Sequence, residues 1–315
     1  MFQMGLSVLS AQKRVSHLPF AIKIDTTPNC QLKCIVCIHG NSPMSFKDKN
    51  MSLALFEKIL EEVDGITSAF SLYYLGEPFI NKDTIKMVEL ASRKRITTFV
   101  SSNFSFNFGR EEIKRIADSG LTSLTVCLDG MTQDIYERTR VKGRVDYIIN
   151  NLKYLQQYKA ENNRKFPFIE VQFLKYTHNE HEIPEIKKLA LSLGLDQLNI
   201  CNGTVVPWWE GGGRARESAQ PREKTFLLKC LWPWISTIIK WNGDVIPCCK
   251  YRFDEQYDDS KSQKYILGSI KNNSLKEIWN GEGYQRIREM VVDPSKLSLD
   301  EQKKAFCYGC WYIYK

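Results

Sequence analysis

Apolar residues in the first two thirds of the chain follow two alternating spacings. Six short runs rich in β-branched and aromatic residues are typical of buried strands, and they are FAIKID from residue 20, FSLYYLG from 70, TTFVSSN from 97, LTVCLD from 124, FIEVQFLKY from 168 and LDQLNIC from 195. Between them, apolar residues recur every three to four positions, which predicts helices over 53–63, 81–94, 110–118, 146–160 and 181–194. Ser52 is the expected N-cap of the first of these helices.

Six strand–helix units in series predict a parallel sheet with right-handed crossovers. A complete barrel of this kind has eight units and carries its active site at the carboxyl ends of the strands. We therefore expect an α/β fold, an incomplete (β/α)6 barrel over 20–203, preceded by an N-terminal extension over 1–19.

The pattern changes after residue 203. Gly, Pro and charged residues over 204–229 indicate a linker or loop. From residue 230 the segments are shorter: a hairpin with Asn242-Gly243 at its turn, a loop over 251–264 and a helix over 274–290. We expect residues 230–315 to form a small, cysteine-rich α+β module that metal binding stabilises.

Composition narrows the class of protein. The formal net charge is +8, from 44 Lys and Arg against 36 Asp and Glu, and these residues are scattered, so we expect no nucleic-acid partner. No apolar run is long enough to span a membrane, and no signal peptide is evident, so we expect a cytoplasmic protein that binds no membrane. Ten cysteines in such a protein indicate metal or redox chemistry rather than disulfides.

Three cysteines, Cys30, Cys34 and Cys37, follow the first predicted strand. A closed zinc site is one interpretation, with His39 as a fourth ligand. The other is a 4Fe–4S cluster held by three thiolates, which leaves one iron open to an external ligand. The position at the catalytic edge of the predicted barrel favours the second interpretation.

The segment CQLKCIVC is similar to the CxxxCxxC motif of the radical S-adenosylmethionine (SAM) superfamily, and later segments agree in order. YLGEP resembles the family's glycine–glutamate motif, SSN lies where the family places ribose contacts, and CLDGMTQDIYERTRVKG resembles a further family segment. The resemblance implies that the cofactor contacts are Gly76, Glu77, Ser101, Ser102, Asn103, Asp129, and Arg138 or Arg140. Val36 departs from the family pattern, which usually has an aromatic residue before the last cysteine.

This resemblance also implies the chemistry. S-adenosylmethionine would chelate the open iron of the first 4Fe–4S cluster, and reductive cleavage would give a 5′-deoxyadenosyl radical that abstracts hydrogen from substrate. A flavodoxin- or ferredoxin-type protein would supply the electron. The cofactor carries this chemistry, while the protein positions it and excludes water.

A second set of cysteines lies in the C-terminal module. The segments WNGDVIPCC and FCYGC resemble the SPASM, or twitch, module, which binds an auxiliary 4Fe–4S cluster; the implied ligands are Cys230, Cys248, Cys307 and Cys310. An all-thiolate zinc site is the alternative. The adjacent Cys249 has three interpretations: the true ligand in place of Cys248, a buried apolar residue, or a catalytic hydrogen-atom donor, as in similar radical epimerases.

Several functions remain open at this stage. The arrangement resembles aminocyclitol dehydrogenases, which implies oxidation of an alcohol to a ketone in a carbohydrate-like or other small molecule. The alternatives are epimerisation of a sugar or peptide residue through Cys249, maturation of a ribosomal peptide, or electron transfer without catalysis. Trp208, Trp209 and Glu210 follow the sixth strand, where they either stack on a sugar or cover the domain junction.

Overall fold

The computed structural model describes residues 2–37, 40, 48–63, 65–203, 230–249, 265–308, 310 and 313. The chain divides into two compact units. The first unit comprises Met1–Asp25, Met51–Phe70 and Ala219–Lys315, and the second comprises Thr26–Asn50 and Ser71–Ser218. Each unit contains one of the two groups of cysteines.

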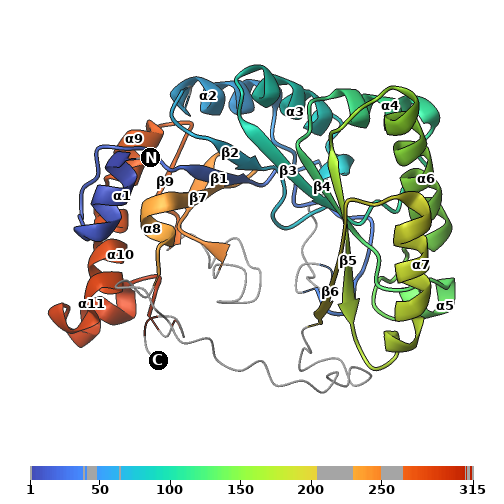
Figure 1. Ribbon diagram of the computed structural model, residues 1–315. Helices are drawn as coiled ribbons and strands as arrows, with labels where there is room; N and C mark the ends of the chain where they lie inside the picture. Colours follow the sequence, from blue (N-terminus) through green and yellow to red (C-terminus); the bar gives the residue numbers. More distant parts are fainter. Residues whose placement is uncertain are drawn as a thin grey trace. The chain divides into compact units, whose positions relative to one another are not determined.

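The second unit is built from successive strand–helix pairs (Figure 1). Its elements are η1 (Pro78–Ile80), α3 (Thr84–Arg93), β3 (Thr97–Ser102), α4 (Arg110–Asp118), β4 (Ser123–Cys127), α5 (Gln133–Glu137), α6 (Val145–Glu161), β5 (Phe168–Lys175), η2 (Glu180–Glu182), α7 (Ile183–Leu193) and β6 (Gln197–Asn202). The strands β3, β4, β5 and β6 pair in this order, and every pairing is parallel.

One face of these strands packs against helices. In Figure 1, α4, α6 and α7 lie along the same side of β4–β6. The strand residues that alternate onto the helix side are fully buried and apolar, and they include Leu124, Val126, Ile169, Val171 and Phe173. Burial of this face supplies the apolar core of the second unit.

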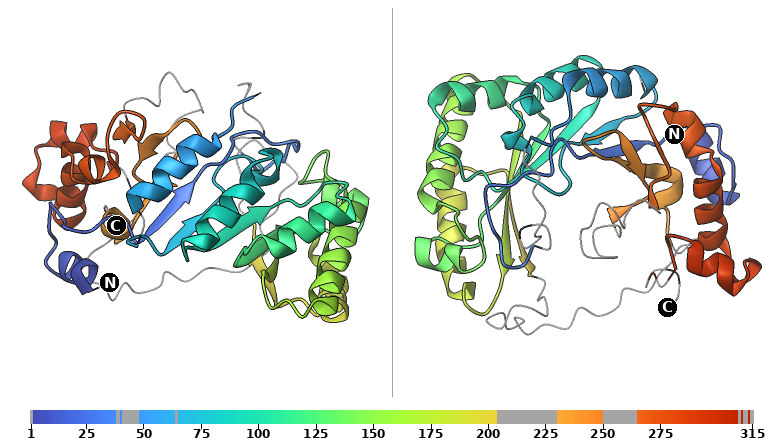
Figure 2. Two further views of the ribbon diagram at one scale, coloured as in Figure 1. Left: turned by 90° about the horizontal axis from the view of Figure 1, so that it is seen from above. Right: turned by 180° about the vertical axis from the view of Figure 1, so that it is seen from behind.

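The first unit combines the start and the end of the chain. Its elements are α1 (Phe2–Leu9), β1 (Ala21–Ile24), α2 (Leu53–Val63), α8 (Trp232–Ile235), β7 (Ser236–Ile239), β8 (Asp244–Ile246), β9 (Gly268–Ser269), α9 (Leu275–Trp279), α10 (Glu282–Val292), η5 (Pro294–Lys296) and α11 (Leu299–Lys304). The strand β2 (Ala69–Ser71) carries the chain from this unit into the second. Figure 2 shows α10 and α11 from two further directions.

In the first unit, β1 pairs in parallel with β7, and β7, β8 and β9 continue as antiparallel neighbours. The predicted hairpin is present: Gly243 has a φ of +91°, and the backbone N–H of Asp244 donates to Asn242 Oδ1 at 3.2 Å. The side-chain amide acceptor and the left-handed glycine both favour this tight turn.

Three sequence predictions differ from the structure. The single helix expected over 274–290 is two helices, α9 and α10, because Asn280-Gly281 interrupts the helical backbone. The second strand is shorter than predicted, since β2 ends at Ser71. The N-terminal extension contains α1, which the sequence pattern did not predict.

Candidate functional site

The three-cysteine loop is fastened to a segment about a hundred residues later in the chain. Lys33 N donates to Val141 O at 3.0 Å, and Ile35 N donates to Thr139 O at 2.9 Å. These two bonds lie on either side of Cys34 in the loop and of Arg140 in the later segment, so the two residues lie close together. A guanidinium hydrogen bond from Arg140 opposes the rise in the pKa of the Cys34 thiol that burial causes.

The glycine–glutamate segment packs directly on this loop. Glu77 N donates to Asn29 O at 2.7 Å. A Cβ atom at Gly76 would lie 2.3 Å from Thr27 O and 2.4 Å from Asn29 O, which is far inside ordinary contact distance. Only glycine allows the two segments to approach this closely.

Glu77 is 2% exposed, and its carboxylate accepts three hydrogen bonds. Ser102 Oγ donates to Oε1 at 2.8 Å, Phe79 N donates to Oε1 at 3.3 Å, and Asn103 N donates to Oε2 at 2.7 Å. Burial raises the pKa of Glu77 to about 7, and these donors together with Arg140 oppose the rise.

The Glu77 carboxylate therefore suits a cationic ligand. Among the described residues, no Lys or Arg forms an ion pair with it. A buried carboxylate without a counter-charge is costly, and a protonated amino group would supply that charge. On this observation, Glu77 fits the amino group of S-adenosylmethionine.

Residues after β3 connect the same carboxylate to the first cysteine. Asn103 Nδ2 lies 3.8 Å from Cys30 Sγ, and Asn103 Oδ1 accepts from Gln31 Nε2 at 3.0 Å. Ser102 is buried, whereas Ser101 is half-buried and its Oγ lies 3.8 Å from Cys127 Sγ. Sequence reasoning missed Gln31, whose only sequence signal is its position beside Cys30.

Asp129 and Arg140 form a buried ion pair. Arg140 Nε donates to Asp129 Oδ2 at 2.6 Å, and Leu174 N donates to Asp129 Oδ1 at 2.9 Å. Asn179 Nδ2 donates to the Asp129 carbonyl oxygen at 2.8 Å. Of the two arginines proposed from sequence, Arg140 therefore lies with Asp129 and Cys34, whereas Arg138 is exposed.

Tyr136 is a further residue of this site to which the sequence analysis gave no role. Its ring is fully buried, and a Cβ atom at Gly130 or Gly143 would collide with Tyr136. Its hydroxyl has no hydrogen-bond partner among the described residues. Burial raises its pKa, Arg140 opposes the rise, and Asp129 and Cys34 add to it, so the phenol lies near all three.

The second group of cysteines lies in the first unit. Cys230 precedes α8, Cys248 follows β8, and Cys307 and Cys310 follow α11. Cys310 N donates to Cys307 O at 3.0 Å, which forms a tight turn between these two cysteines. Cys307 is buried, the other three are half-buried, and Cys249 is exposed, so Cys249 is not the buried apolar residue of the second interpretation.

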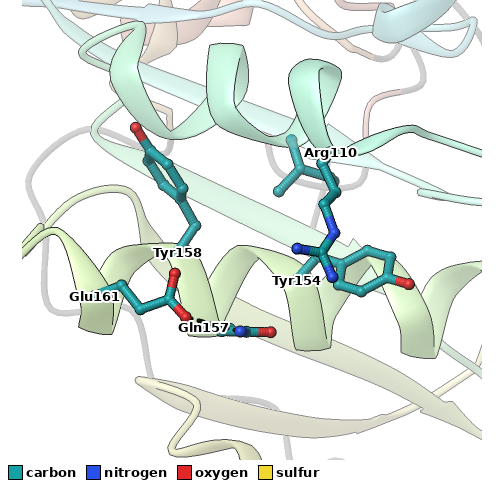
Figure 3. Close-up of a pocket in the computed structure, with 6 residues that line it drawn as sticks. Arg110, Tyr154, Gln157, Tyr158 and Glu161 are labelled. Atoms are coloured by element: carbon teal, nitrogen blue, oxygen red, sulfur yellow. Dashed lines mark hydrogen bonds between the residues drawn. The ribbon is translucent and has the colours of Figure 1, made fainter.

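Some predicted site residues cannot be placed. His39, Trp208, Trp209 and Glu210 lie outside the described residues. Within the described part of the chain, neither group of cysteines is drawn together around a single metal ion, so the choice between zinc and iron–sulfur at each group stays open on geometry alone. The pocket in Figure 3, between α4 and α6, is lined by Arg110, Tyr154 and Glu161 among others and contains none of the predicted site residues.

Comparison with known families explains this arrangement. Residues 24–190 match the radical SAM superfamily. This chain belongs to that superfamily. Residues 230–311 match the SPASM iron–sulfur cluster-binding domain.

The similar proteins act on different substrates. The tungsten-containing aldehyde ferredoxin oxidoreductase cofactor-modifying protein of Pyrococcus furiosus is 22% identical over 84% of this chain and 82% of that protein. The PqqA peptide cyclase of Bradyrhizobium diazoefficiens is 23% identical over 61% of this chain and 48% of the cyclase. Identity at this level leaves the substrate open.

Solved structures agree on the fold. Streptococcus suis SuiB bound to S-adenosylmethionine has a TM-score of 0.68 at 17% identity, covering 90% of this chain and 70% of SuiB. BtrN in complex with AdoMet and 2-DOIA has a TM-score of 0.54 at 15% identity, and the match covers 93% of this chain and 92% of BtrN. The predicted fold class, a partial barrel with a C-terminal SPASM module, is confirmed.

The predicted cofactors are confirmed at the level of the family. A radical SAM domain implies a 4Fe–4S cluster and S-adenosylmethionine, and a SPASM domain implies auxiliary iron–sulfur binding. The individual ligand and contact residues and the domain boundaries stay predictions. In the part of the chain that the structure describes, every helix is too short or too polar to cross a bilayer.

Proposed function

We propose that this radical SAM enzyme oxidises an alcohol to a ketone in a carbohydrate-like or other small molecule. The observation that carries the proposal is the SPASM match over 230–311, which contains Cys230, Cys248, Cys307 and Cys310. Four thiolates would fill every iron of an auxiliary 4Fe–4S cluster. Such a cluster has no place for substrate, so acceptance of an electron from the oxidised carbon is its most suitable role.

The residues of the second unit have distinct roles in this proposal. Cys30, Cys34 and Cys37 hold the first cluster, and Glu77 receives the amino group of S-adenosylmethionine. With that cofactor, the cluster supplies abstraction of hydrogen from an unactivated C–H bond. Ser102 and Asn103 hold the Glu77 carboxylate in place at 2.8 and 2.7 Å, and Asp129 fixes Arg140 beside Cys34.

Epimerisation is the second candidate, and a specific observation favours it. Cys249 is exposed, so its thiol is accessible, as a hydrogen-atom donor must be. A peptide substrate is the third candidate. It is supported by the similarity to PqqA peptide cyclase and to SuiB. The structure of SuiB bound to the precursor peptide SuiA matches this chain with a TM-score of 0.63.

The test separates these functions by the source of hydrogen in the product. Anaerobically reconstituted protein is given S-adenosylmethionine, dithionite and candidate sugars in deuterated water, and 5′-deoxyadenosine and products are analysed by mass spectrometry. Oxidation predicts a product two hydrogens lighter with no deuterium on the reacting carbon. Epimerisation predicts one deuterium at that carbon and its loss in Cys249→Ala. Cys30→Ala is the control, because it should abolish 5′-deoxyadenosine formation.

Absence of 5′-deoxyadenosine from the wild-type protein under every reductant would overturn the proposed chemistry. A product that is an isomer of the substrate would overturn the oxidation and favour the second candidate. Reaction of peptides with no reaction of small polyols would favour the third candidate.

A further inference from the structure

The strands β3–β6 have a second face, opposite the helices, and it is polar. Register aligns Ser101, Thr125 and Glu170 in one row, and Cys127, Gln172 and Asn199 in the next row toward the carboxyl ends of the strands. These residues alternate with the buried apolar residues that face the helices. We call these six residues the polar face.

Parallel sheets in α/β folds are normally covered on both sides, and their strands are apolar throughout. Here only the helix side follows that rule. Except for Cys127, the polar face is half-buried, and it offers hydroxyl, amide and carboxylate groups. This composition suits a polar ligand better than an apolar layer of the protein.

The polar face adjoins the candidate cofactor site. Burial raises the pKa of the Cys127 thiol. Arg140 and a hydrogen bond with Ser101 oppose the rise, and the charges of Asp129 and Glu77 add to it. Ser101 Oγ lies 3.8 Å from Cys127 Sγ. A molecule that lies on the polar face beside Cys127 is therefore next to the residues assigned to the cofactor.

Glu170 is the one charged residue of the polar face. Asn199 Nδ2 donates to its Oε1 at 3.2 Å, which orients the carboxylate. In the described part of the chain, no Lys or Arg forms an ion pair with Glu170. The carboxylate retains acceptor capacity, since each ionised oxygen can accept about two hydrogen bonds.

A phenol extends the polar face beyond the strands. The pKa of Tyr73 is raised mainly by burial and further by Cys127 and Glu170, and a hydrogen bond with Ser71 opposes the rise. Tyr73 follows β2, so it brings a second type of hydroxyl donor to the same region.

We propose that the polar face binds the substrate, and that Glu170, oriented by Asn199, binds a protonated amine of a small polyol. The inference rests on the proposed function and names its substrate class. The hydroxyl and amide groups of Thr125, Gln172 and Asn199 pair with the hydroxyls of the polyol, while the carboxylate sets the preference for an amine.

Two other substrate classes fit the polar face less well. A phosphorylated or carboxylated sugar would place its negative charge near Glu170, and like charges repel. A lysine side chain would bring an ammonium group on four methylenes, which need apolar surface that these six residues do not offer. An amino-substituted polyol satisfies both the charge and the many polar groups.

The test measures binding by isothermal titration calorimetry on the full, anaerobically reconstituted chain with S-adenosylmethionine present. The probes are glucosamine, glucose, glucose 6-phosphate and N-acetyl-lysine methylamide, each up to about 10 mM. The variants are Glu170→Gln, which keeps the shape and removes the charge, and Glu111→Gln, a control on the exposed side of α4.

A charge-assisted hydrogen bond predicts that glucosamine binds about tenfold or more tightly than glucose. Glu170→Gln should bring the two affinities within about threefold of each other, and Glu111→Gln should keep the preference. Four results would overturn the inference: no binding of glucosamine, tighter binding of glucose 6-phosphate, equal binding of the lysine derivative, or an unchanged preference in Glu170→Gln.

The same samples are assayed for 5′-deoxyadenosine, so the two proposals fail separately. Formation of 5′-deoxyadenosine without an amine preference overturns only the inference about Glu170. Absence of 5′-deoxyadenosine overturns the proposed function whatever the binding result.

Discussion

Replacement of Gly76 by alanine tests whether close backbone approach builds the cofactor site. The new Cβ would lie 2.3 Å from Thr27 O, 2.4 Å from Asn29 O and 2.6 Å from Pro28 C. A relaxed C···O contact is about 3.3 Å or longer, so the segments must separate by about 1 Å. That movement strains the hydrogen bond from Glu77 N to Asn29 O.

The displaced residues directly precede Cys30 and Glu77, so stability and chemistry should both suffer. Overpacking of this kind costs about 1–3 kcal/mol of unfolding free energy. A misplacement of about 1 Å at a reacting centre can reduce the rate about a hundredfold. We expect Gly76→Ala to lower the thermal midpoint of the cofactor-free protein and to reduce 5′-deoxyadenosine formation by about that factor.

Gly5→Ala is the matched control. Gly5 lies within α1, and a Cβ atom there meets nothing within 4 Å. The same substitution should therefore leave the chemistry unchanged and stabilise the helix by about 0.5–1 kcal/mol. The reasoning is refuted if Gly76→Ala matches the wild type in thermal midpoint, S-adenosylmethionine affinity and 5′-deoxyadenosine formation.

Three further predictions concern buried charges. Because the folded-state pKa of Glu77 is raised to about 7, its contribution to stability is present below about pH 4.5 and is lost as the pH rises through 7. Urea unfolding of cofactor-free protein should show this loss, about 3 kcal/mol, in the wild type and not in Glu77→Gln. Asp129→Asn leaves Arg140 without its counter-charge, so urea unfolding should show a loss of about 3–5 kcal/mol in unfolding free energy. Adding Arg140→Met should restore part of that loss. A loss below about 1 kcal/mol in Asp129→Asn would contradict the prediction. Arg288→Leu removes the donors to Pro233 O and Lys13 O and the contacts of the guanidinium with the rings of Trp279 and Tyr284, at 4.7 and 5.4 Å. Calorimetry should therefore show a loss of about 3 kcal/mol or more in unfolding free energy. An unchanged thermal midpoint would contradict a stabilising role for Arg288.

The sequence predicted the repeating elements well because their signals are local. The helix over 53–63 was predicted with its N-cap at Ser52, and Ser52 Oγ accepts from Leu55 N at 3.3 Å. The break at Asn280-Gly281 was missed, because apolar residues continue at helical spacing on both sides of it. The composition of α10, with a fully buried Arg288, is also explained only by tertiary contacts.

The candidate site was predicted from the order of its motifs, but the partners within it were not. The sequence offered Arg138 and Arg140 equally, since only Thr139 lies between them. The structure distinguishes them through Asp129, whose distance from Arg140 depends on how β4 and the following turn fold. Glu170 had no motif at all, and its position became meaningful only through the strand register.

The pairing of 33–35 with 139–141 explains how motifs so far apart serve one site. Each backbone hydrogen bond alone is worth about 1 kcal/mol, so the two together hold the cysteine loop only moderately. The Asp129–Arg140 ion pair adds a second attachment, because Leu174 N fixes Asp129 to β5 while Arg140 reaches Cys34. The position of Cys34 therefore depends on β4, β5 and the turn after α5 as well as on its own loop. It follows that a substitution at Asp129 should disturb the position of Cys34, although the two residues lie on separate segments of the chain.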